Sequence, residues 1–390
     1  MTGIKGLADE KELVKILQDL VRIESINPGY KGSTVGEINV LKYVAAYMDA
    51  NGIEYEIQDA LPGRPNIVAK LPGKTRDGII MEAHMDTVSV EGMSIDPFDP
   101  VIKDGLMYGR GSCDTKGSLA CMMYAMAMMK RSGIVPATDV YLAGAVDEEL
   151  AYRGVVKLLE HGVNWKYGII GEPTESEIVV ACKGVIRFPL ICRGKAAHSS
   201  RPWEGHNAIQ DMGEMLHVIK TVLIPEYMKK THPMLGYSTI NVGVIEGGEL
   251  INIVPAECRV EIDIRALPGQ TFDQVKADLE REIAKLKAED PTFDCTVGDP
   301  LLLDYAMETP QDSEIVKTAV RVSREIQGKD FVKAVFFDCD GTKLDRAGVP
   351  NIVLGPGSIN QAHSAVEYVE IAQLTRCAEL YAGICAELQV

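Results

Sequence analysis

Residues 78–84, GIIMEAH, form a short apolar run that ends on a histidine. Runs of the same kind recur through the N-terminal half of the chain, and these are NIVAKL (66–71), VYLAGAV (140–146) and YGIIG (167–171). Helical patterns lie between or beside them, in GSLACMMYAMAMMK (117–130) and YRGVVKLLEHG (152–162). Alternation of apolar strands with helices is typical of an α/β protein whose sheet is at least partly parallel.

The pattern changes between residues 184 and 298, where we expect a second domain. VIRFPLICRG predicts a strand, HNAIQDMGEMLHVIKTVL a helix, YSTINVGVI and AECRVEIDIRA two strands, TFDQVKADLEREIAKLKA a helix and FDCTVGD a final strand. The order βαββαβ is that of a ferredoxin-like sandwich. Residues 299–390 then return to helix, strand and helix. The sequence therefore predicts a small α+β domain, 184–298, inserted into an α/β domain made of residues 1–183 and 299–390.

The composition indicates a large, acidic, globular protein. The 390 residues exceed the size at which one core usually keeps growing, which also favours two domains. The formal charge of −16 argues against nucleic acid and anionic membranes as partners and leaves room for bound cations. No run approaches the ~18 apolar residues of a membrane span, and the first residues have the period of an amphipathic helix rather than of a signal peptide. The nine scattered cysteines are expected to be buried thiols in a reducing cytoplasm.

Histidines and carboxylates fall near the ends of the predicted strands or at the start of a predicted helix. They are His84, Asp114, Glu148, Glu149, Glu172 and His363. In open α/β sheets, ligands bind outside the carboxyl ends of the strands, where successive loops converge. Two imidazoles and several carboxylates delivered to one edge of a sheet predict a metal site.

Each of these residues also has a purely structural interpretation. His84, taken alone, could be a histidine of the core. Asp114 could be a carboxylate near the positive end of a helix dipole. The sequence DEE (147–149) could be a solvated loop. Single residues are easily explained in this way, whereas their joint recurrence at strand ends is not.

Motifs along essentially the whole chain carry a family resemblance. They are HMDTV (84–88), GRGSCDTKG (109–117), DEE (147–149), GEPTE (171–175), GKAAHSS (194–200), DIRALPG (263–269) and LGPGSINQAH (354–363). In this order they resemble the zinc-dependent deacylases and exopeptidases of the M20 peptidase family. The last motif is most similar to the branch of acetylornithine deacetylases and succinyl-diaminopimelate desuccinylases. The resemblance implies a metal-dependent exopeptidase-like catalytic domain with a mixed central sheet, and an inserted ferredoxin-like dimerisation domain.

The resemblance also implies a pair of divalent metal ions that share one ligand, Asp114. His84 and Glu172 would complete the first ion, and Glu149 and His363 the second. Some branches of the family have aspartate at the position of Glu172, and the longer side chain suits the deacylases better than the aminopeptidases. Zinc is the expected metal, and the ligands are also compatible with cobalt or manganese.

Three further residues would complete the catalytic machinery of such an enzyme. Asp86 would orient His84 by accepting the second N–H of its ring. Glu148, the glutamate of the pair that is not a ligand, would take a proton from water and deliver it to the departing amine. His198 would stabilise the oxyanion from the small domain of a partner subunit. An ordinary surface or capping role is the alternative for His198.

The resemblance places the substrate against the small domain and one loop of the large domain. Asn252 and Arg265 would face the substrate, and Arg265 could bind a substrate carboxylate with two hydrogen bonds. Alternatively, Arg265 could stabilise a neighbouring strand. Gly355, Gly357 and Ser358 would shape a loop against the substrate, or form a plain turn.

These inferences predict a cytoplasmic, homodimeric, two-metal amidohydrolase that releases a free amino acid and a carboxylate from an N-acyl amino acid. N-acetylornithine, a substrate of arginine biosynthesis, is the substrate that the resemblance favours. Succinyl-diaminopimelate or a C-terminal dipeptide is the alternative within the same chemistry. A binding or regulatory protein without activity is an alternative of another class, which the complete set of ligands and the base argue against.

Overall fold

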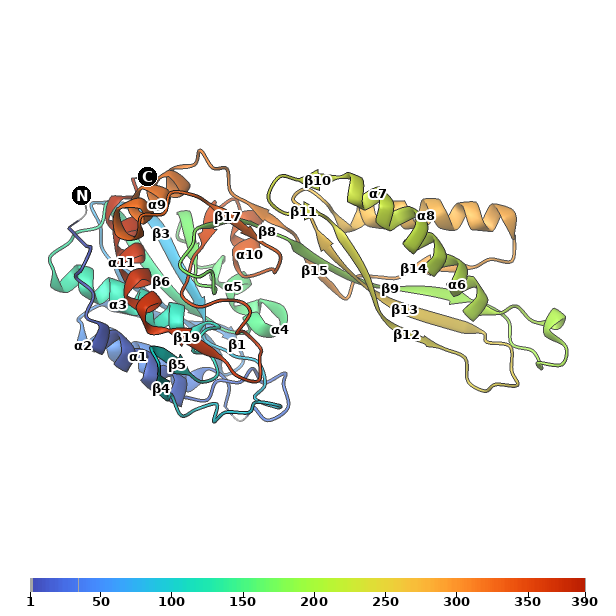
Figure 1. The fold of residues 1–390 in the computed structure, drawn as a ribbon, viewed down its shortest axis with the longest axis horizontal. Coiled ribbons are helices and arrows are strands. Elements are labelled where there is room, and N and C mark those ends of the chain that lie inside the picture. Colours follow the sequence, from blue (N-terminus) through green and yellow to red (C-terminus); the bar gives the residue numbers. More distant parts are fainter. Residues whose placement is uncertain (1–2, 34, 390) are drawn as a thin grey trace. The chain divides into compact units, whose positions relative to one another are not determined.

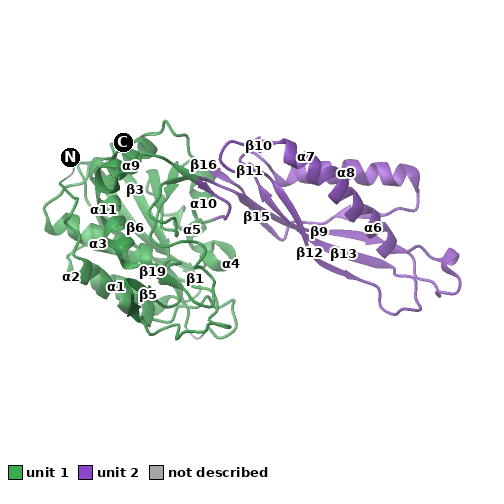
Figure 2. Ribbon diagram, in the orientation of Figure 1, with its two compact units in different colours: residues 1–180, 309–333, 339–390 green, residues 181–308, 334–338 purple. Residues whose placement is uncertain are grey.

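The computed structural model describes residues 3–33 and 35–389, which divide into two compact units (Figures 1 and 2). Unit 1 comprises residues 1–180, 309–333 and 339–390, and unit 2 comprises residues 181–308 and 334–338. Unit 2 is therefore an insertion in unit 1. A short segment at 334–338, which the sequence assigned to the large domain, groups with unit 2.

A mixed sheet has the order β1-β2-β6-β3-β7-β18-β8-β16, with β17 beside β8. Its central strands belong to unit 1, whereas β16 falls within the segment 181–308 of unit 2. The pairs β6–β3, β3–β7 and β7–β18 are parallel, and the flanking pairs are antiparallel. The strands are β1 (Glu54–Leu61), β2 (Arg64–Leu71), β3 (Thr75–His84), β6 (Thr138–Ala145), β7 (Trp165–Ile170), β8 (Val179–Cys182), β16 (Met307–Glu308), β17 (Lys333–Val335) and β18 (Asn351–Val353). The central strands are buried, as their near-continuous apolar sequences require.

Helices cover both faces of this sheet (Figure 1). α3 is buried along almost its whole length and packs between α1 and α11. Cys385 of α11 contacts Met81 of β3, whereas Leu344 of α10 lies against Gly168 on the other face. The helices of unit 1 are α1 (Glu10–Arg22), α2 (Ile38–Ala50), α3 (Lys116–Arg131), α4 (Glu148–Ala151), α5 (Arg153–Leu158), α9 (Glu314–Gln327), α10 (Gly341–Arg346) and α11 (Ile371–Glu387). A small sheet of β4 (Ile102–Lys103), β5 (Leu106–Tyr108) and β19 (Tyr368–Glu370) completes the unit.

Unit 2 is a ferredoxin-like sandwich with an antiparallel sheet in the order β12-β13-β9-β14, and β15 also pairs with β9. Alternate residues of β9 and β13 point to one face and pack against α6 and α8, and the burial of β13 alternates accordingly. The elements are β9 (Gly184–Arg193), α6 (Ala208–Val218), α7 (Ile224–Lys229), β10 (Thr231–His232), β11 (Gly236–Tyr237), β12 (Thr239–Gly247), β13 (Glu257–Ala266), α8 (Phe272–Glu289), β14 (Cys295–Val297) and β15 (Leu302–Asp304).

Several details differ from the expectations drawn from sequence. The single helix expected over HNAIQDMGEMLHVIKTVL is α6 followed by a π-helical turn, Ile219–Leu223, and then α7. The hairpin β10–β11 and the pair of elements α2 and β1 were not predicted. Most cysteines are buried free thiols, as expected, but Cys192 and Cys295 face each other across β9 and β14 and are joined by a disulfide. No helix within the described residues is long and apolar enough to cross a membrane.

Candidate metal centre

The parallel strands at the middle of the unit 1 sheet bring the predicted site residues together. β3 ends at His84, and β6 and β7 lie on either side of it. The loop after β6 leads into α4, which begins at Glu148, and Glu172 follows β7. Because these strands are parallel, their carboxyl ends meet at one edge of the sheet. Asp114 reaches the same edge from the turn before α3, across a cis peptide bond to Thr115.

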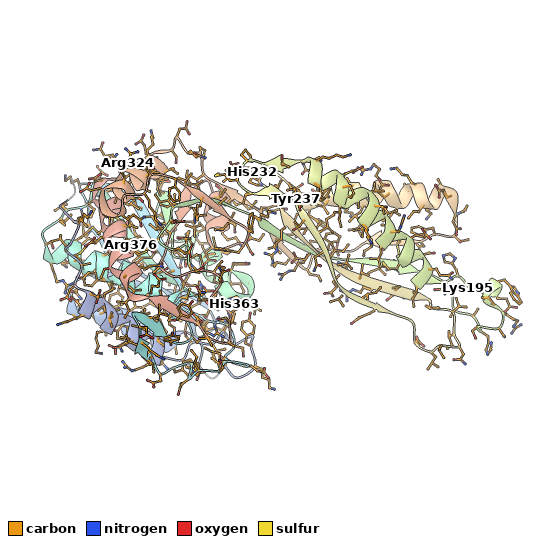
Figure 3. All side chains as sticks on the ribbon, in the orientation of Figure 1. Lys195, His232, Tyr237, Arg324, His363 and Arg376 are labelled. Atoms are coloured by element: carbon orange, nitrogen blue, oxygen red, sulfur yellow. A yellow bond between two sulfur atoms is a disulfide. The ribbon has the colours of Figure 1, made fainter. Side chains whose placement is uncertain are left out.

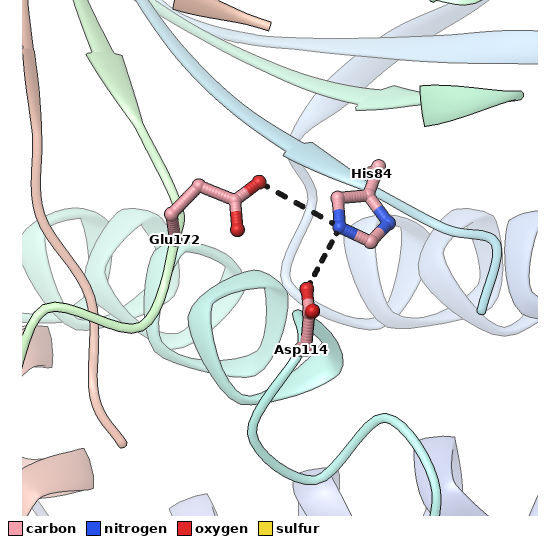
Figure 4. A group of neighbouring side chains, drawn as sticks. All are labelled: His84, Asp114 and Glu172. Atoms are coloured by element: carbon pink, nitrogen blue, oxygen red, sulfur yellow. Dashed lines mark hydrogen bonds and ion pairs between the residues drawn. The ribbon is translucent and has the colours of Figure 1, made fainter. Parts of the chain in front are cut away.

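His84, Asp114 and Glu172 form the first candidate group of metal ligands, and all are buried (Figure 4). Nε2 of His84 lies 3.1 Å from Oδ1 of Asp114 and 3.6 Å from Oε1 of Glu172. One ligand atom from each residue lies within 4.8 Å of the other two. This spacing is compatible with a single ion between them, since zinc binds such atoms at about 2.0–2.2 Å.

Asp114, Glu149 and His363 form the second group, so that Asp114 belongs to both. Nε2 of His363 lies 3.1 Å from Oε2 of Glu149 and 3.3 Å from Oδ2 of Asp114. Asp114 therefore presents one carboxylate oxygen to each histidine. His363 comes from the loop before β19 (Figure 3) and has a left-handed backbone, with φ of 57°. Its side chain is 54% exposed, so the second group is more open than the first.

Without a cation, the buried carboxylates of the two groups lie close to one another, and their negative charges repel. Burial and the neighbouring Asp114 hold the pKa of Glu172 well above its usual range, and the same causes raise the pKa of Glu149 to about 7. The carboxylates of Asp114 and Glu149 raise the pKa of His363 to about 10. Oε1 of Glu149 is buried and has no hydrogen-bond partner among the described residues. A mixed set of imidazole nitrogens and carboxylate oxygens with excess negative charge fits divalent cations such as zinc, cobalt or manganese.

Glu148 lies beside these groups without belonging to either of them within the described residues. Burial raises the pKa of its carboxyl group well above the usual range, and the nearby Glu172 adds to this effect. The two adjacent glutamates thus differ: Glu149 belongs to a candidate ligand group, and Glu148 does not within the described residues.

The carboxylate of Asp86 does not accept the ring N–H of His84, which was the role expected for it. Nδ1 of His84 lies 2.9 Å from the backbone carbonyl of Asp86, whereas the nearest carboxylate oxygen of Asp86 is 3.7 Å away. The carboxylate instead accepts the backbone N–H groups of Glu148 and Glu149, each at 3.2 Å. The main chain of Asp86 therefore orients the histidine, and its side chain holds the turn that carries both glutamates.

The predicted residues of unit 2 fall in two places. His198 and Asn252 lie at the same end of the unit: His198 forms a β-bridge with Ile253, and Ser199 donates its N–H to the carbonyl of Asn252 at 3.0 Å. His198 is exposed, and its Nδ1 lies 2.7 Å from the Ser200 hydroxyl.

Arg265 is near the other end of β13, where its guanidinium binds Asp263 and Asp338, each at 3.1 Å. The guanidinium therefore already has carboxylate partners within its own unit. Of the two interpretations that the sequence left open, this geometry favours the one in which Arg265 stabilises neighbouring segments.

The glycine-rich loop after β18 lies directly against the loops that carry Asp114 and Glu172. A Cβ atom on Gly355 would approach the carbonyl oxygen of Glu172 to 2.4 Å, which is too close for any side chain. Gly357 has φ of 83° and lies against Cys113, and the thiol of Cys113 donates to the carbonyl of Ser358 at 3.3 Å. The glycines are thus required for close approach to the loops that carry the ligands.

Glu367, which fixes the loop of the shared aspartate, was not among the residues predicted from the sequence. Oε1 of Glu367 accepts the backbone N–H groups of Cys113 and Asp114 at 3.0 and 3.1 Å, and Oε2 binds Arg110 at 2.6 Å. All of these side chains are buried. The one available signal was position, because Glu367 follows His363 by a few residues.

Comparisons with known proteins agree with this arrangement. A profile of peptidase family M20/M25/M40 matches residues 80–387. The acetylornithine deacetylase of Myxococcus xanthus is 32% identical over 360 residues, which cover 90% of this chain and 92% of that protein. The N-formyl-4-amino-5-aminomethyl-2-methylpyrimidine deformylase of Bacillus subtilis is 27% identical over 398 residues, which cover 94% of this chain and 92% of that protein.

A solved structure shares the fold over nearly the whole chain. The aminopeptidase PepT of Bacillus cereus superposes with a TM-score of 0.79 at 24% identity, and the match covers 98% of this chain and 100% of that one. Together with the profile match, these likenesses extend across both compact units. The chain therefore belongs to peptidase family M20/M25/M40, a family of metal-dependent hydrolases that cleave amide bonds.

Proposed function

We propose that this protein is a two-metal amidohydrolase that removes the acyl group from an N-acyl amino acid, as an acetylornithine deacetylase does. The observation that carries the proposal is the pair of ligand groups that share Asp114, with Glu148 beside them and outside both. The acetylornithine deacetylase of M. xanthus, at 32% identity over most of both chains, supports the acyl amino acid as substrate class.

In this proposal His84, Asp114 and Glu172 hold one divalent ion, and Asp114, Glu149 and His363 hold the other. Zinc fits the donor set, and cobalt or manganese would bind the same ligands. When bound, two divalent ions lower the pKa of water and polarise the amide carbonyl of the substrate. The remaining chemistry belongs to the side chains of the protein.

Glu148 acts as general base and then as general acid. Its carboxylate takes a proton from the attacking water and delivers it to the nitrogen of the departing amino acid. In the metal-free chain, burial and the neighbouring carboxylates raise the pKa of Glu148, so its carboxylate is a stronger base than an exposed glutamate. His198 donates a hydrogen bond to the oxyanion that forms on the carbonyl oxygen.

A panel of substrates tests this proposal. Metal-loaded protein should hydrolyse N-acetylornithine or a related N-acetyl amino acid with the highest kcat/KM. The panel should include N-succinyl-diaminopimelate, C-terminal dipeptides and an N-formyl aminopyrimidine, because a deformylase is also a relative. Preference for one of these other compounds, with no turnover of N-acetyl amino acids, would contradict the proposed substrate and leave the amidohydrolase chemistry intact.

Replacing Glu148 by glutamine tests the division of labour between the adjacent glutamates. Glu148→Gln should reduce kcat by about 10²–10⁴-fold, because the amide cannot accept the proton. The zinc content, measured by plasma emission spectroscopy, should stay at two ions per chain. Glu160→Gln, on the exposed surface of the same unit, is the control and should leave both quantities unchanged. Loss of one ion from Glu148→Gln would identify Glu148 as a ligand instead.

The protonation of the metal-free site predicts how metal binding depends on pH. His363 has a pKa of about 10 and Glu149 a pKa of about 7 in the absence of metal, so near neutral pH His363 is protonated and Glu149 is partly protonated, and an ion must displace these protons. The apparent affinity for Zn²⁺ should therefore rise as the pH increases from about 6 to about 8. Calorimetric titrations in two buffers with different ionisation enthalpies should show proton release. Binding without proton release, at an affinity independent of pH, would refute this description of the site.

We also propose that the protein is a homodimer in which His198 of each protomer serves the other's metal centre. β12 is an edge strand of unit 2 and exposes Val244 and Ile245. An exposed apolar edge strand can pair with the same strand of a second copy. Analytical ultracentrifugation should show a dimer, and Ile245→Lys should shift it to a monomer. Mixing His198→Ala chains with Glu148→Gln chains should restore activity, because each mixed dimer has one complete site. Mixed dimers that stay inactive would exclude donation across the interface.

A further inference from the structure

A buried cluster of charged and amide side chains surrounds the turn that carries both glutamates. Asp147 begins this turn in a left-handed conformation, with φ of 72°, although it is not glycine and is completely buried. Such a backbone is unfavourable for a residue other than glycine and persists only where the surroundings determine it. The question is which residues hold this turn in place.

Buried carboxylates accept the N–H groups of three successive residues in the turn. Glu37 accepts the N–H of Asp147 at 3.3 Å. Asp86 accepts those of Glu148 and Glu149, each at 3.2 Å. Both carboxylates are buried, so the backbone of the turn is attached to two acidic groups that must themselves be fixed.

Arg64, at the start of β2, provides that attachment. Its guanidinium forms a two-pronged ion pair with Glu37, through Nε at 2.8 Å and through Nη2. Nη1 binds the carboxylate of Asp147 at 3.0 Å. One guanidinium thus binds the side chain of Asp147 directly and its backbone N–H through Glu37. The planar fork of arginine suits this double role, whereas a lysine ammonium does not.

Asn27 links the two acidic groups on either side of the turn, and Arg153, at the start of α5, also binds the carboxylate of Asp147. Nδ2 of Asn27 donates to Asp86 at 2.7 Å and to Asp147 at 3.1 Å. Because Asp86 also orients His84 through its carbonyl group, Asn27 connects the HMD loop with the DEE turn. The amide is fully buried, and it supplies a donor to two carboxylates that would otherwise repel each other.

We infer that Arg64 and Asn27 are positioning residues for the metal centre: they hold the left-handed turn at Asp147 so that Glu149 points to the second ion and Glu148 to the substrate water. The inference rests on the ligand roles given under the proposed function. It extends them to residues that touch neither metal nor substrate and that lie far from Glu148 in the sequence. The sequence motifs did not include either residue.

Metal binding separates this role from a simple effect of charge. Removal of the Arg64 cation would by itself tighten the binding of both ions, since it removes a positive charge near them. Loss of positioning has the opposite effect on affinity. It should weaken the binding of only one ion, the one that Glu149 helps to hold. Changes in groups that support metal ligands typically cost about 10–100-fold in affinity.

The experiment compares Arg64→Met with the matched control Arg131→Met, which removes the guanidinium of an exposed ion pair with Glu12. Zn²⁺ binding is measured by competition with a chromophoric chelator, and folding by thermal unfolding. Arg64→Met should lose about 10–100-fold in affinity for one of two ions and keep the other. Arg64→Lys should fall between this variant and wild type, because it keeps the charge without the fork. Arg131→Met should bind both ions as wild type does.

Asn27→Ala provides the second test, which remains valid if Arg64→Met fails to fold. It removes the amide link without removing a charged side chain, and it should weaken the binding of the same ion. On any substrate that the protein hydrolyses, kcat should fall in both variants while KM changes little. Folded variants that bind both ions with wild-type or higher affinity would overturn the inference. Because metal binding is measured without substrate, failure of the proposed acyl amino acid activity would not affect this result.

Discussion

Carboxylates that repel one another are held close together and away from water in the candidate metal centre. Asp114, Glu148, Glu149 and Glu172 converge at the carboxyl ends of three neighbouring parallel strands, together with two histidines. Bringing ionised carboxylates out of water costs several kcal/mol each unless cations offset the charge. The burial that raises the pKa values of Glu149 and Glu172 in the metal-free chain is the same feature that makes the site favourable for divalent cations.

The surrounding structure holds these groups through backbone N–H groups and buried ion pairs. Glu367 binds the main chain of Asp114, and Asp86 binds the main chain of Glu148 and Glu149. In both places a buried carboxylate fixes the loop that carries a candidate ligand. Arginine side chains, Arg110 and Arg64, then neutralise these supporting groups. The site is therefore an inner set of carboxylates suited to metal, surrounded by a set already paired with arginine or amide groups.

The sequence predicted the parts of this structure that depend on local pattern. The apolar runs predicted β2, β3, β6 and β7, the element order βαββαβ predicted the ferredoxin-like unit, and strand ends predicted where His84 and Glu172 would lie. Contacts between segments that are distant in the sequence could not be predicted from local pattern. Arg64 and Asn27 meet Asp147 only because β2 pairs with β6 and because the segment after α1 crosses the end of β3. Likewise, Asp86 appeared to be a partner of the histidine ring, but its side chain instead binds a turn that comes from another strand.

A crystal structure of the zinc-loaded protein, with anomalous scattering recorded at the zinc edge, would locate the ions and their ligands. We expect two zinc peaks about 3.5–4 Å apart, one beside His84 and Glu172 and the other beside Glu149 and His363, with an Asp114 oxygen on each. The oxygens of Glu148 should lie beyond the coordination distance of about 2.0–2.2 Å from both ions. A single ion, or a Glu148 oxygen within that distance, would contradict the assignment of Asp114 as the shared ligand and Glu148 as the base.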